Sequence, residues 1–460
     1  MRFSEFFKKD RNIALVLFFV VFLSKLPTMG LDYHWDAVLY SKQALFYAEN
    51  GPFAVPGGRI AHVPLLQWIT AMPFKVLGES PFVGHFIIAL FSFIGVFFAY
   101  KTGKIIGGKK TGIVGAFFVF LSPAYFSISG QFLFDVPVTA ATLAAVYYFA
   151  KNDVNGYLLS ASAAVLLKET GILIVGAAIL YAVFRERKKI VIYALPVLLT
   201  IIWQLWMSFN RPVSGFLISS SALNIPARLI AATYDALFMN YSWLLSILIL
   251  YAIYKKKSVK GRLDILPITI AVYILFFGIV PVFMLPRYFM PATAIAAVWA
   301  AGSLTNTIKK YNIVALIVCF LLASTFAIHD GVKGLAEDPV YRGGIYENKI
   351  TALKNGEMTM DYADFVKADE DAIKYIIANY SGKTVAAEFP IYEPEMANVD
   401  VGERQWLKNK IHVIPLNESK KADILVYQTC CSSFPLTNWP VEAEFKSNLQ
   451  DIIIYKNPDK

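Results

Sequence analysis

The sequence predicts a polytopic α-helical membrane protein of about eleven spans with a soluble α/β domain at its C-terminal end. The chain of 460 residues is 57% hydrophobic and only 17% charged, whereas soluble proteins carry roughly 25% charged residues. Apolar runs of about 20 residues, the length that spans a bilayer, recur as far as His329. Beyond Asp330 charged residues become common, and no later run is long enough to cross a membrane.

The predicted spans are separated by short links, and basic residues gather in alternate links. The expected spans are residues 12–29, 82–100, 112–128, 136–150, 155–167, 170–184, 190–208, 241–254, 264–285, 288–305 and 312–329. The basic clusters at 101–110, 185–189 and 255–262 then fall on one side of the membrane. Because Lys and Arg mark cytoplasmic links, the N-terminus is predicted inside a cytoplasmic (plasma) membrane and the C-terminal domain outside. The net charge of +10 reflects this topology, and nucleic-acid binding is not expected.

Two regions are predicted to lie on the outer side. Residues 30–81 form a long first loop of the membrane domain (1–330), and its segments 36–49 and 62–77 are amphipathic and rich in aromatic residues. Such segments are typical of helices that lie in the membrane interface. Residues 331–460 form the soluble domain. It is expected to contain a helix over 368–380 and short strands at 384–387, 411–414, 423–427 and 451–455.

Ionisable side chains gather at the outer ends of the predicted spans, where carboxylates are costly beside lipid unless they are used. They are Asp32, Asp36, Asp135, Lys168, Glu169 and Arg287, with Arg59 and His62 in the first outer loop. A carboxylate in this position can take a proton from a hydroxyl group. Lys and Arg can hold a phosphate. With a hydrophobic groove beside them, these groups are what transfer from a lipid phosphate requires.

Simpler structural roles are open for the same residues. Asp135 lies two residues before Pro137 and serves equally well as a helix cap, whereas we favour a functional role for Asp36 over a capping role. Lys168 and Arg287 are long enough to reach the interface without any further task. No His, Cys or Asp cluster has the spacing of a metal site. A divalent cation between Asp36 and Asp135 would lack any further ligand that we can name, so no cofactor is assigned.

Five motif regions follow one another along residues 10–330. They are Trp35-Asp36-Ala-Val-Leu-Tyr40, His62-Val-Pro-Leu-Leu-Gln-Trp68 with Leu77-Gly78-Glu79-Ser80, Phe134-Asp135-Val-Pro, Leu167-Lys168-Glu-Thr-Gly171, and Arg287-Tyr288-Phe-Met-Pro291. Each motif is weak alone. Their order and spacing together resemble the GT-C glycosyltransferases of the protein O-mannosyltransferase and aminoarabinose-transferase type.

The resemblance implies an inverting glycosyltransferase that moves a hexosyl or pentosyl group from a polyprenyl- or dolichyl-phosphate donor to a protein, lipid or glycan acceptor outside the membrane. It makes Asp36 the base that deprotonates the acceptor and Asp135 a residue that orients substrates. Lys168 and Arg287 would face the donor phosphate. The substrate-binding residues implied are Arg59, His62, Lys168, Arg287, Tyr288 and Tyr40. The family's usual Glu after the first Asp is Ala37 here, and the first Pro of the His62 motif is Val63, so the acceptor class is not assigned.

Three rival classes predict different features. An oligosaccharyltransferase would carry a Trp-Trp-Asp-Tyr-Gly run in the outer domain, and residues 331–460 contain none. A secondary transporter would show inverted repeats and charges near mid-membrane, whereas the charges here lie at span ends. A membrane scaffold without catalytic activity would tolerate substitution of both Asp36 and Asp135.

Overall fold

The chain divides into two compact units. Unit 1 comprises Met1–Met29, Ala61–Leu66 and His85–Val340, and unit 2 comprises Gly30–Ile60, Gln67–Gly84 and Tyr341–Lys460. The computed structural model describes residues 9–33, 36–55, 62–210, 225–237, 242–254, 261–280, 285–307, 361–387, 412–428, 438–446 and 452–460. The predicted domain boundary at residue 330 lies outside these ranges.

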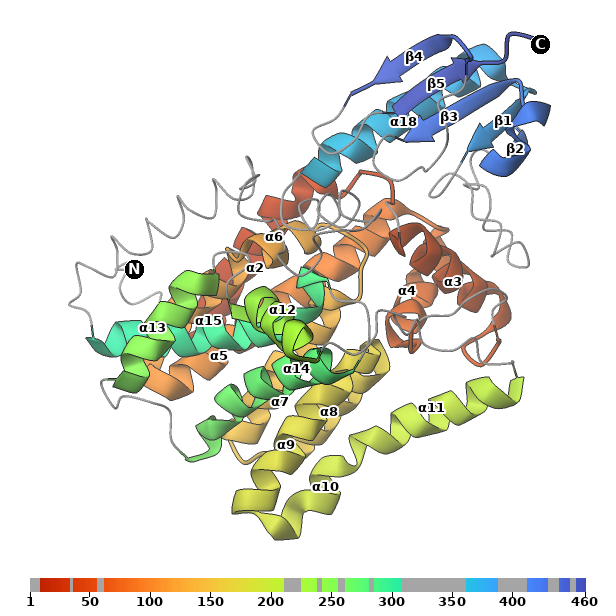
Figure 1. The fold of residues 1–460 in the computed structure, drawn as a ribbon. Helices are drawn as coiled ribbons and strands as arrows, with labels where there is room; N and C mark the ends of the chain where they lie inside the picture. Colours follow the sequence, from red (N-terminus) through yellow and green to blue (C-terminus); the bar gives the residue numbers. More distant parts are fainter. Residues whose placement is uncertain are drawn as a thin grey trace. The chain divides into compact units, whose positions relative to one another are not determined.

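Unit 1 is a helical bundle (Figure 1). Its helices are α2 (Asp10–Lys25), α5 (Pro81–Phe120), α6 (Pro123–Ile128), α7 (Asp135–Ala150), α8 (Val154–Leu167), α9 (Ile172–Arg185), α10 (Ile190–Ala194), α11 (Pro196–Asn210), α12 (Ile225–Leu237), α13 (Ser242–Tyr254), α14 (Ile265–Ile279) and α15 (Met290–Thr307). Short 3₁₀ turns link several of them: η1 (Leu26–Thr28), η2 (Glu169–Gly171), η3 (Arg187–Lys189), η5 (Gly261–Asp264) and η6 (Pro286–Phe289).

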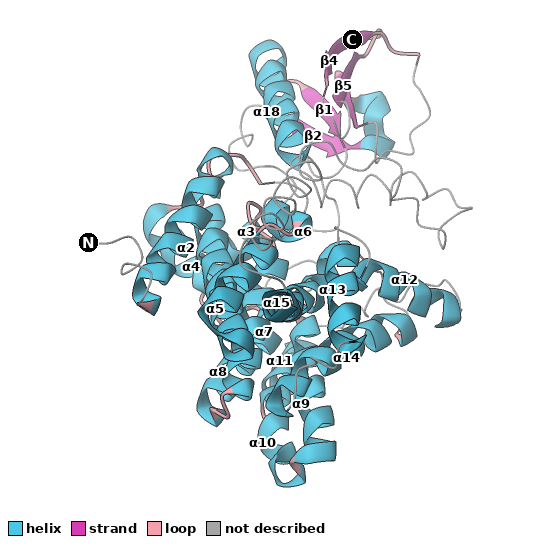
Figure 2. Ribbon diagram, turned by 90° about the vertical axis from the view of Figure 1, so that its left-hand side faces the viewer, coloured by secondary structure: helices cyan, strands magenta, loops and turns pink. Residues whose placement is uncertain are grey.

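The centre of the bundle is formed by α15, which packs against α7, α13 and α14. This helix is rich in alanine, and most of its residues from Met290 to Leu304 are buried. Small side chains allow helix backbones to approach closely inside a membrane protein. Figure 2 views α15 almost end-on, with neighbouring helices of the unit around it.

Five helical segments in the described part of the chain are long and apolar enough to cross a membrane. They are Asp10–Thr28, Pro81–Phe120, Arg187–Phe209, Gly261–Ile279 and Arg287–Thr305. Each predicted span overlaps with helices of the described residues, except 312–329, which lies outside them. The predicted multi-pass helical class is therefore confirmed, while the count of eleven spans stays a prediction.

The long helix α5 contains the predicted span 82–100 and the first part of the span 112–128, joined by a reversal at Gly107 and Gly108, and α6 forms the rest of the second span. Gly108 has a φ of 82°, a backbone conformation that glycine adopts without a steric penalty. After the reversal the two arms touch: a Cβ atom added to Gly103 would lie 2.8 Å from the carbonyl oxygen of Thr111. The basic link predicted between the two spans is thus a tight glycine turn.

Helix α12 lies between the predicted spans 190–208 and 241–254, where no helix was predicted. The buried charged residues Arg228 and Asp235 interrupt its apolar pattern, so hydropathy alone does not reveal it. Arg228 Nη2 donates to the carbonyl oxygens of Phe277 at 3.0 Å and Val280 at 2.6 Å. These carbonyls lie at the end of α14, where helical partners run out. Arg228, which is distant in the sequence, therefore supplies hydrogen bonds to the carbonyl groups at the end of α14.

Unit 2 contains the helices of the first outer loop, α3 (Asp36–Asn50) and α4 (Leu65–Leu77). Gln67 Nε2 donates to Gln43 Oε1 at 3.0 Å, and the rings of Tyr47 and Trp68 meet edge to face with centroids 6.4 Å apart. The two predicted amphipathic segments are therefore helices that pack on each other.

The C-terminal part of unit 2 is a mixed five-stranded sheet of order β2-β1-β3-β5-β4 with α18 (Asp361–Tyr380) along one face (Figures 1 and 2). Ala372, Ile373 and Ile376 of α18 pack on Val385 and Ile424 of the sheet. The pairs β1–β2 and β1–β3 are parallel, and the other two are antiparallel. The strands are β1 (Thr384–Ala387), β2 (His412–Pro415), β3 (Ile424–Gln428), β4 (Val441–Phe445) and β5 (Ile452–Lys456), and the turn η8 (Leu416–Lys421) follows β2.

The predicted helix and four strands match this sheet, whereas no strand was expected at β4. Glu442 and Glu444 give β4 a polar sequence, and Val441 is 59% exposed. An edge strand with charged side chains is common because charge discourages pairing with other chains. Its place in the fold depends on its antiparallel pairing with β5.

We expect Gly103→Ala to destabilise the protein because the new methyl group would collide with the backbone of the other arm of α5, at a cost of roughly 1–3 kcal/mol. Gly176→Ala is the matched control, since its nearest neighbour would be Val272 Cγ1 at 3.8 Å. Thermal unfolding of the purified protein should show a lower Tm for the first variant only. Equal Tm values would contradict the close contact between the arms.

Candidate functional site

A cluster of three buried ionic side chains lies where α7 begins, where α8 ends and where η6 leads into α15. Asp135 is the first residue of α7, and its Oδ1 accepts a hydrogen bond from Lys168 Nζ at 2.5 Å. Arg287 Nε lies 3.8 Å from the other oxygen, Oδ2. The three side chains are 5%, 6% and 9% exposed for Asp135, Lys168 and Arg287. Residues far apart in the sequence thus share one buried carboxylate.

Lys168 is held in place by the tight turn between α8 and α9. Its backbone is extended (φ −156°, ψ 147°) and ends α8, and its N–H still donates to Ala164 O at 3.2 Å. A side chain at Gly171 would collide with the carbonyl of Ala164, so the turn can close only with glycine at this position. The extended residue directs the ammonium group away from the helix and toward Asp135.

Arg287 and Tyr288 lie in η6, the turn that leads into α15. This turn packs against α6, α12 and α15. Lys168 Nζ lies over the face of the Tyr288 ring, 4.2 Å from its centroid, and the Arg287 guanidinium carbon is 5.6 Å from it. The ring in turn stacks on Phe277 of α14 at an interplanar angle of 20°. Tyr288 therefore supports both cations with its negative ring face.

Two cations of this cluster, Lys168 and Arg287, share the carboxylate of Asp135. The neighbouring Glu169 adds a second carboxylate beside Lys168. Burial reduces the dielectric screening of these charges. Arg binds phosphate through two N–H groups and Lys through a compact ammonium. The arrangement is suited to an anion such as a phosphate.

His62 is positioned by Glu169, the residue next to Lys168. His62 Nδ1 lies 2.8 Å from Glu169 Oε2, and the backbone N–H of Val63 donates to Glu169 Oε1 at 2.9 Å. The imidazole ring also packs on Phe134, with centroids 4.8 Å apart. Burial opposes ionisation of Glu169, but the adjacent His62 and its hydrogen bond outweigh it and lower the pKa of this carboxyl. Glu169 thereby joins the His62 segment to the Lys168 turn.

Asp36 and Tyr40 lie on α3 in unit 2, Asp36 as the first residue of the helix and Tyr40 buried one turn later. The helix is anchored by Lys42, whose Nζ lies 2.7 Å from Glu79 Oε2, and the Ser41 hydroxyl donates to the same carboxylate. Arg59 lies outside the described residues.

In the structure, Asp135 is not the capping residue of α7. The residue in the cap position of α7 is Phe134, and the Asp135 carboxylate is directed to Lys168 instead. Neither Glu169 nor Glu79 had been assigned a role from sequence, although both stand inside the motifs. In the part of the chain that the structure describes, no three His, Cys, Asp or Glu side chains are grouped so as to hold a metal ion.

We expect Asp135→Asn to lower the stability of the protein because it removes the buried carboxylate that Lys168 and Arg287 share, at a cost of roughly 3–5 kcal/mol. Glu418→Gln makes the same chemical change in an exposed pair, in which Glu418 is 44% and Lys421 74% exposed. That control should cost about 1 kcal/mol or less. Thermal unfolding gives the Tm of Asp135→Asn and of Glu418→Gln. Similar decreases in Tm for the two variants would refute the central role of Asp135.

We expect the contribution of Glu169 to depend on pH. Because its pKa is lower in the folded protein than in the unfolded chain, the stabilisation is fully present above the unfolded value of about 4.3 and is lost as pH falls through the folded value. Wild type should therefore exceed Glu169→Gln in Tm at about pH 5–6, and the difference should shrink below about pH 4. A difference that grows on acidification would contradict the lowered pKa.

Comparison with known proteins gives one family match. The model of the family described as dolichyl-phosphate-mannose-protein mannosyltransferase matches residues 61–209. This segment contains His62, Asp135, Lys168 and Glu169. No curated protein sequence matches the chain.

Solved structures of two proteins match the chain, and the first of them shares its fold. ArnT from Cupriavidus metallidurans, bound to undecaprenyl phosphate, has 12% sequence identity, a TM-score of 0.56 and 97% of each chain covered. The oligosaccharyltransferase of Archaeoglobus fulgidus in its apo form has 12% identity and a TM-score of 0.48, over 90% of this chain and 69% of that one. The chain therefore has the fold of ArnT and contains a segment, residues 61–209, that matches the mannosyltransferase family model.

Proposed function

We propose that the protein is an inverting glycosyltransferase that moves a sugar from a polyprenyl- or dolichyl-phosphate carrier to an acceptor on the outer face of the cytoplasmic membrane. The observation that carries this proposal is the buried cluster in which two cations, Lys168 and Arg287, lie beside one carboxylate, Asp135. The N-terminus lies in the cytoplasm in this proposal, and the sheet of unit 2 lies outside.

Lys168 and Arg287 hold the phosphate of the donor. Both are less than 10% exposed, so solvent only weakly screens the attraction between these cations and a bound phosphate. Asp135 keeps the two cations in place when the site is empty and orients them when the phosphate is bound. The structure of ArnT, whose fold is similar, holds undecaprenyl phosphate, which supports a lipid phosphate as the ligand. His62 and Tyr288 complete this side of the site, and Arg59 and Tyr40 are further substrate-binding residues.

The reaction is a single displacement at the anomeric carbon of the donor sugar. The acceptor oxygen forms a bond to that carbon while the bond from the carbon to the phosphate oxygen breaks, so the configuration inverts. The electron pair of the broken bond leaves with the lipid phosphate. Positive charge at Lys168 and Arg287 stabilises the negative charge that develops on this leaving group.

Asp36 accepts the proton of the acceptor hydroxyl as the new bond forms, and later releases it to water. It is the first residue of α3 and half-buried, a position at which a carboxylate can reach a polar substrate while its backbone stays rigid. The anchoring of α3 by Lys42 and Glu79 supports this assignment, since a catalytic base must be held in a defined position.

We expect Asp36→Asn to reduce transfer by roughly 10²–10⁴-fold, because an amide cannot take the proton. The assay uses purified protein in nanodiscs, a synthetic polyprenyl-phosphate hexose and a hydroxyl acceptor. The KM for the donor should change little, since Asp36 does not contact the phosphate in this mechanism.

Asp153→Asn is the control, because Asp153 only caps α8 by accepting a hydrogen bond from Gly156 N at 3.0 Å. Full activity of Asp36→Asn would exclude the base role. Uptake of a solute into proteoliposomes without any glycosyl transfer would favour a transporter instead.

A further inference from the structure

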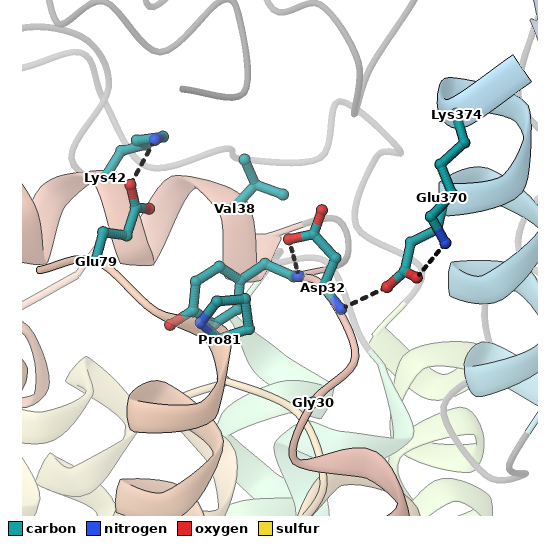
Figure 3. Close-up of a pocket in the computed structure, with 9 residues that line it drawn as sticks. Gly30, Asp32, Val38, Lys42, Glu79, Pro81, Glu370 and Lys374 are labelled. Atoms are coloured by element: carbon teal, nitrogen blue, oxygen red, sulfur yellow. Dashed lines mark hydrogen bonds and ion pairs between the residues drawn. The ribbon is translucent and has the colours of Figure 1, made fainter. Parts of the chain in front are cut away.

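The segment that leads into α3, and so to the proposed base Asp36, is held from two sides within unit 2. Figure 3 shows this segment beside a pocket of about 380 Å³, whose lining includes Gly30 and Asp32 together with residues of α3 and α18. Parts of the chain that are distant in the sequence thus meet close to the start of α3. The phosphate cluster does not use these contacts, because all of its members belong to unit 1.

The first anchor of the segment comes from the C-terminal part of unit 2. Glu370 of α18 accepts a hydrogen bond from the backbone N–H of Asp32 through its Oε1 at 3.0 Å (Figure 3). Its other oxygen, Oε2, lies 3.5 Å from Lys374 Nζ, one turn further along the same helix. Helix α18 is itself fixed, because Ile373 and Ile376 are buried against the sheet. Residue 32 is therefore tied to the C-terminal sheet.

The second anchor comes from the residues that precede α5. The Tyr33 hydroxyl donates to Ser80 O at 2.9 Å. The neighbouring Glu79 binds Lys42 of α3, with 2.7 Å between Oε2 and Nζ. Residues 79–80 thus hold both the segment and the helix that follows it, and Asp36 lies between these two points of attachment in the sequence.

These anchors bear on the chemistry of Asp36. A general base acts only from within hydrogen-bond reach of the hydroxyl that it deprotonates, and a displacement of about 1 Å costs roughly 10²-fold in rate. Asp36 is the first residue of α3, so its backbone moves with the segment that precedes the helix. The hydrogen bond to Glu370 restricts that segment four residues before the base.

We propose that Glu370 is a positioning residue for the transfer reaction, through which the C-terminal part of unit 2 holds the segment that carries Asp36. This proposal rests on the proposed function, in which Asp36 is the base. Glu370 does not touch substrate in this role and supplies only a hydrogen-bond acceptor. Its loss therefore lowers kcat, whereas the KM for the donor, which is set by the phosphate cluster, stays the same.

The test compares Glu370→Ala with Glu370→Gln in the full chain in nanodiscs. The donor is a polyprenyl-phosphate hexose. The acceptor is a peptide containing Ser and Thr or the methyl glycoside of a disaccharide, whichever wild type uses, and release to water is measured in parallel. Glu370→Ala should lower kcat by roughly tenfold to a hundredfold, while Glu370→Gln, which keeps an Oε1 acceptor, should remain close to wild type. Glu418→Ala makes the same truncation in an exposed pair and should leave kcat unchanged.

A double-mutant cycle separates positioning from stability. Because Glu370 acts through Asp36, Glu370→Ala should change the residual kcat little once Asp36→Asn is present. A substitution that merely destabilised the protein would lower kcat by the same factor in both backgrounds, and the Tm would fall with it.

The outcomes separate the two proposals. Wild-type kcat in Glu370→Ala, or an equal factor of loss with and without Asp36→Asn, overturns the positioning role while the enzyme activity stands. Equal losses in Glu370→Gln and Glu370→Ala also overturn it, since Gln retains the acceptor oxygen. If wild type neither transfers the hexose nor releases it to water, the proposed function itself fails. A loss confined to Glu370→Ala, and absent when Asp36→Asn is present, supports the assignment.

Discussion

The sharing of one buried carboxylate by two cations is the interaction on which unit 1 depends. Asp135 opens α7, Lys168 ends α8, and Arg287 precedes α15, so the cluster joins three helix ends. A buried charge without a partner is strongly destabilising, and each of these side chains therefore constrains the position of the other two. The tight turn at Gly171 and the packing of η6 against α12 hold the participating backbone segments.

This constraint also creates the chemical property of the site. The shared carboxylate of Asp135 holds Lys168 and Arg287 in defined positions, and in the proposed reaction these two cations bind the donor phosphate. Tyr288 lies against both cations, and Glu169 holds the His62 segment to the same turn. In the proposed reaction this site would serve the leaving phosphate, which needs no proton because it departs as a stable anion.

The two compact units separate the two halves of the proposed chemistry. Unit 1 contains the groups assigned to the donor phosphate, whereas unit 2 contains Asp36, the proposed base. The first outer loop belongs with the C-terminal sheet in unit 2, and the contact between Asp32 and Glu370 ties them.

The sequence by itself determined the membrane class, the positions of the described helices at the predicted spans and most strands of the C-terminal sheet, because hydrophobic length and alternation are local properties. It also supplied Asp135, Lys168 and Arg287 as candidates. Only the tertiary structure decided that these three meet, that Glu169 holds His62, that α12 is a helix and that β4 joins the sheet edge. Each of these depends on contacts between residues far apart in the chain, and such contacts leave no periodic trace in the local sequence.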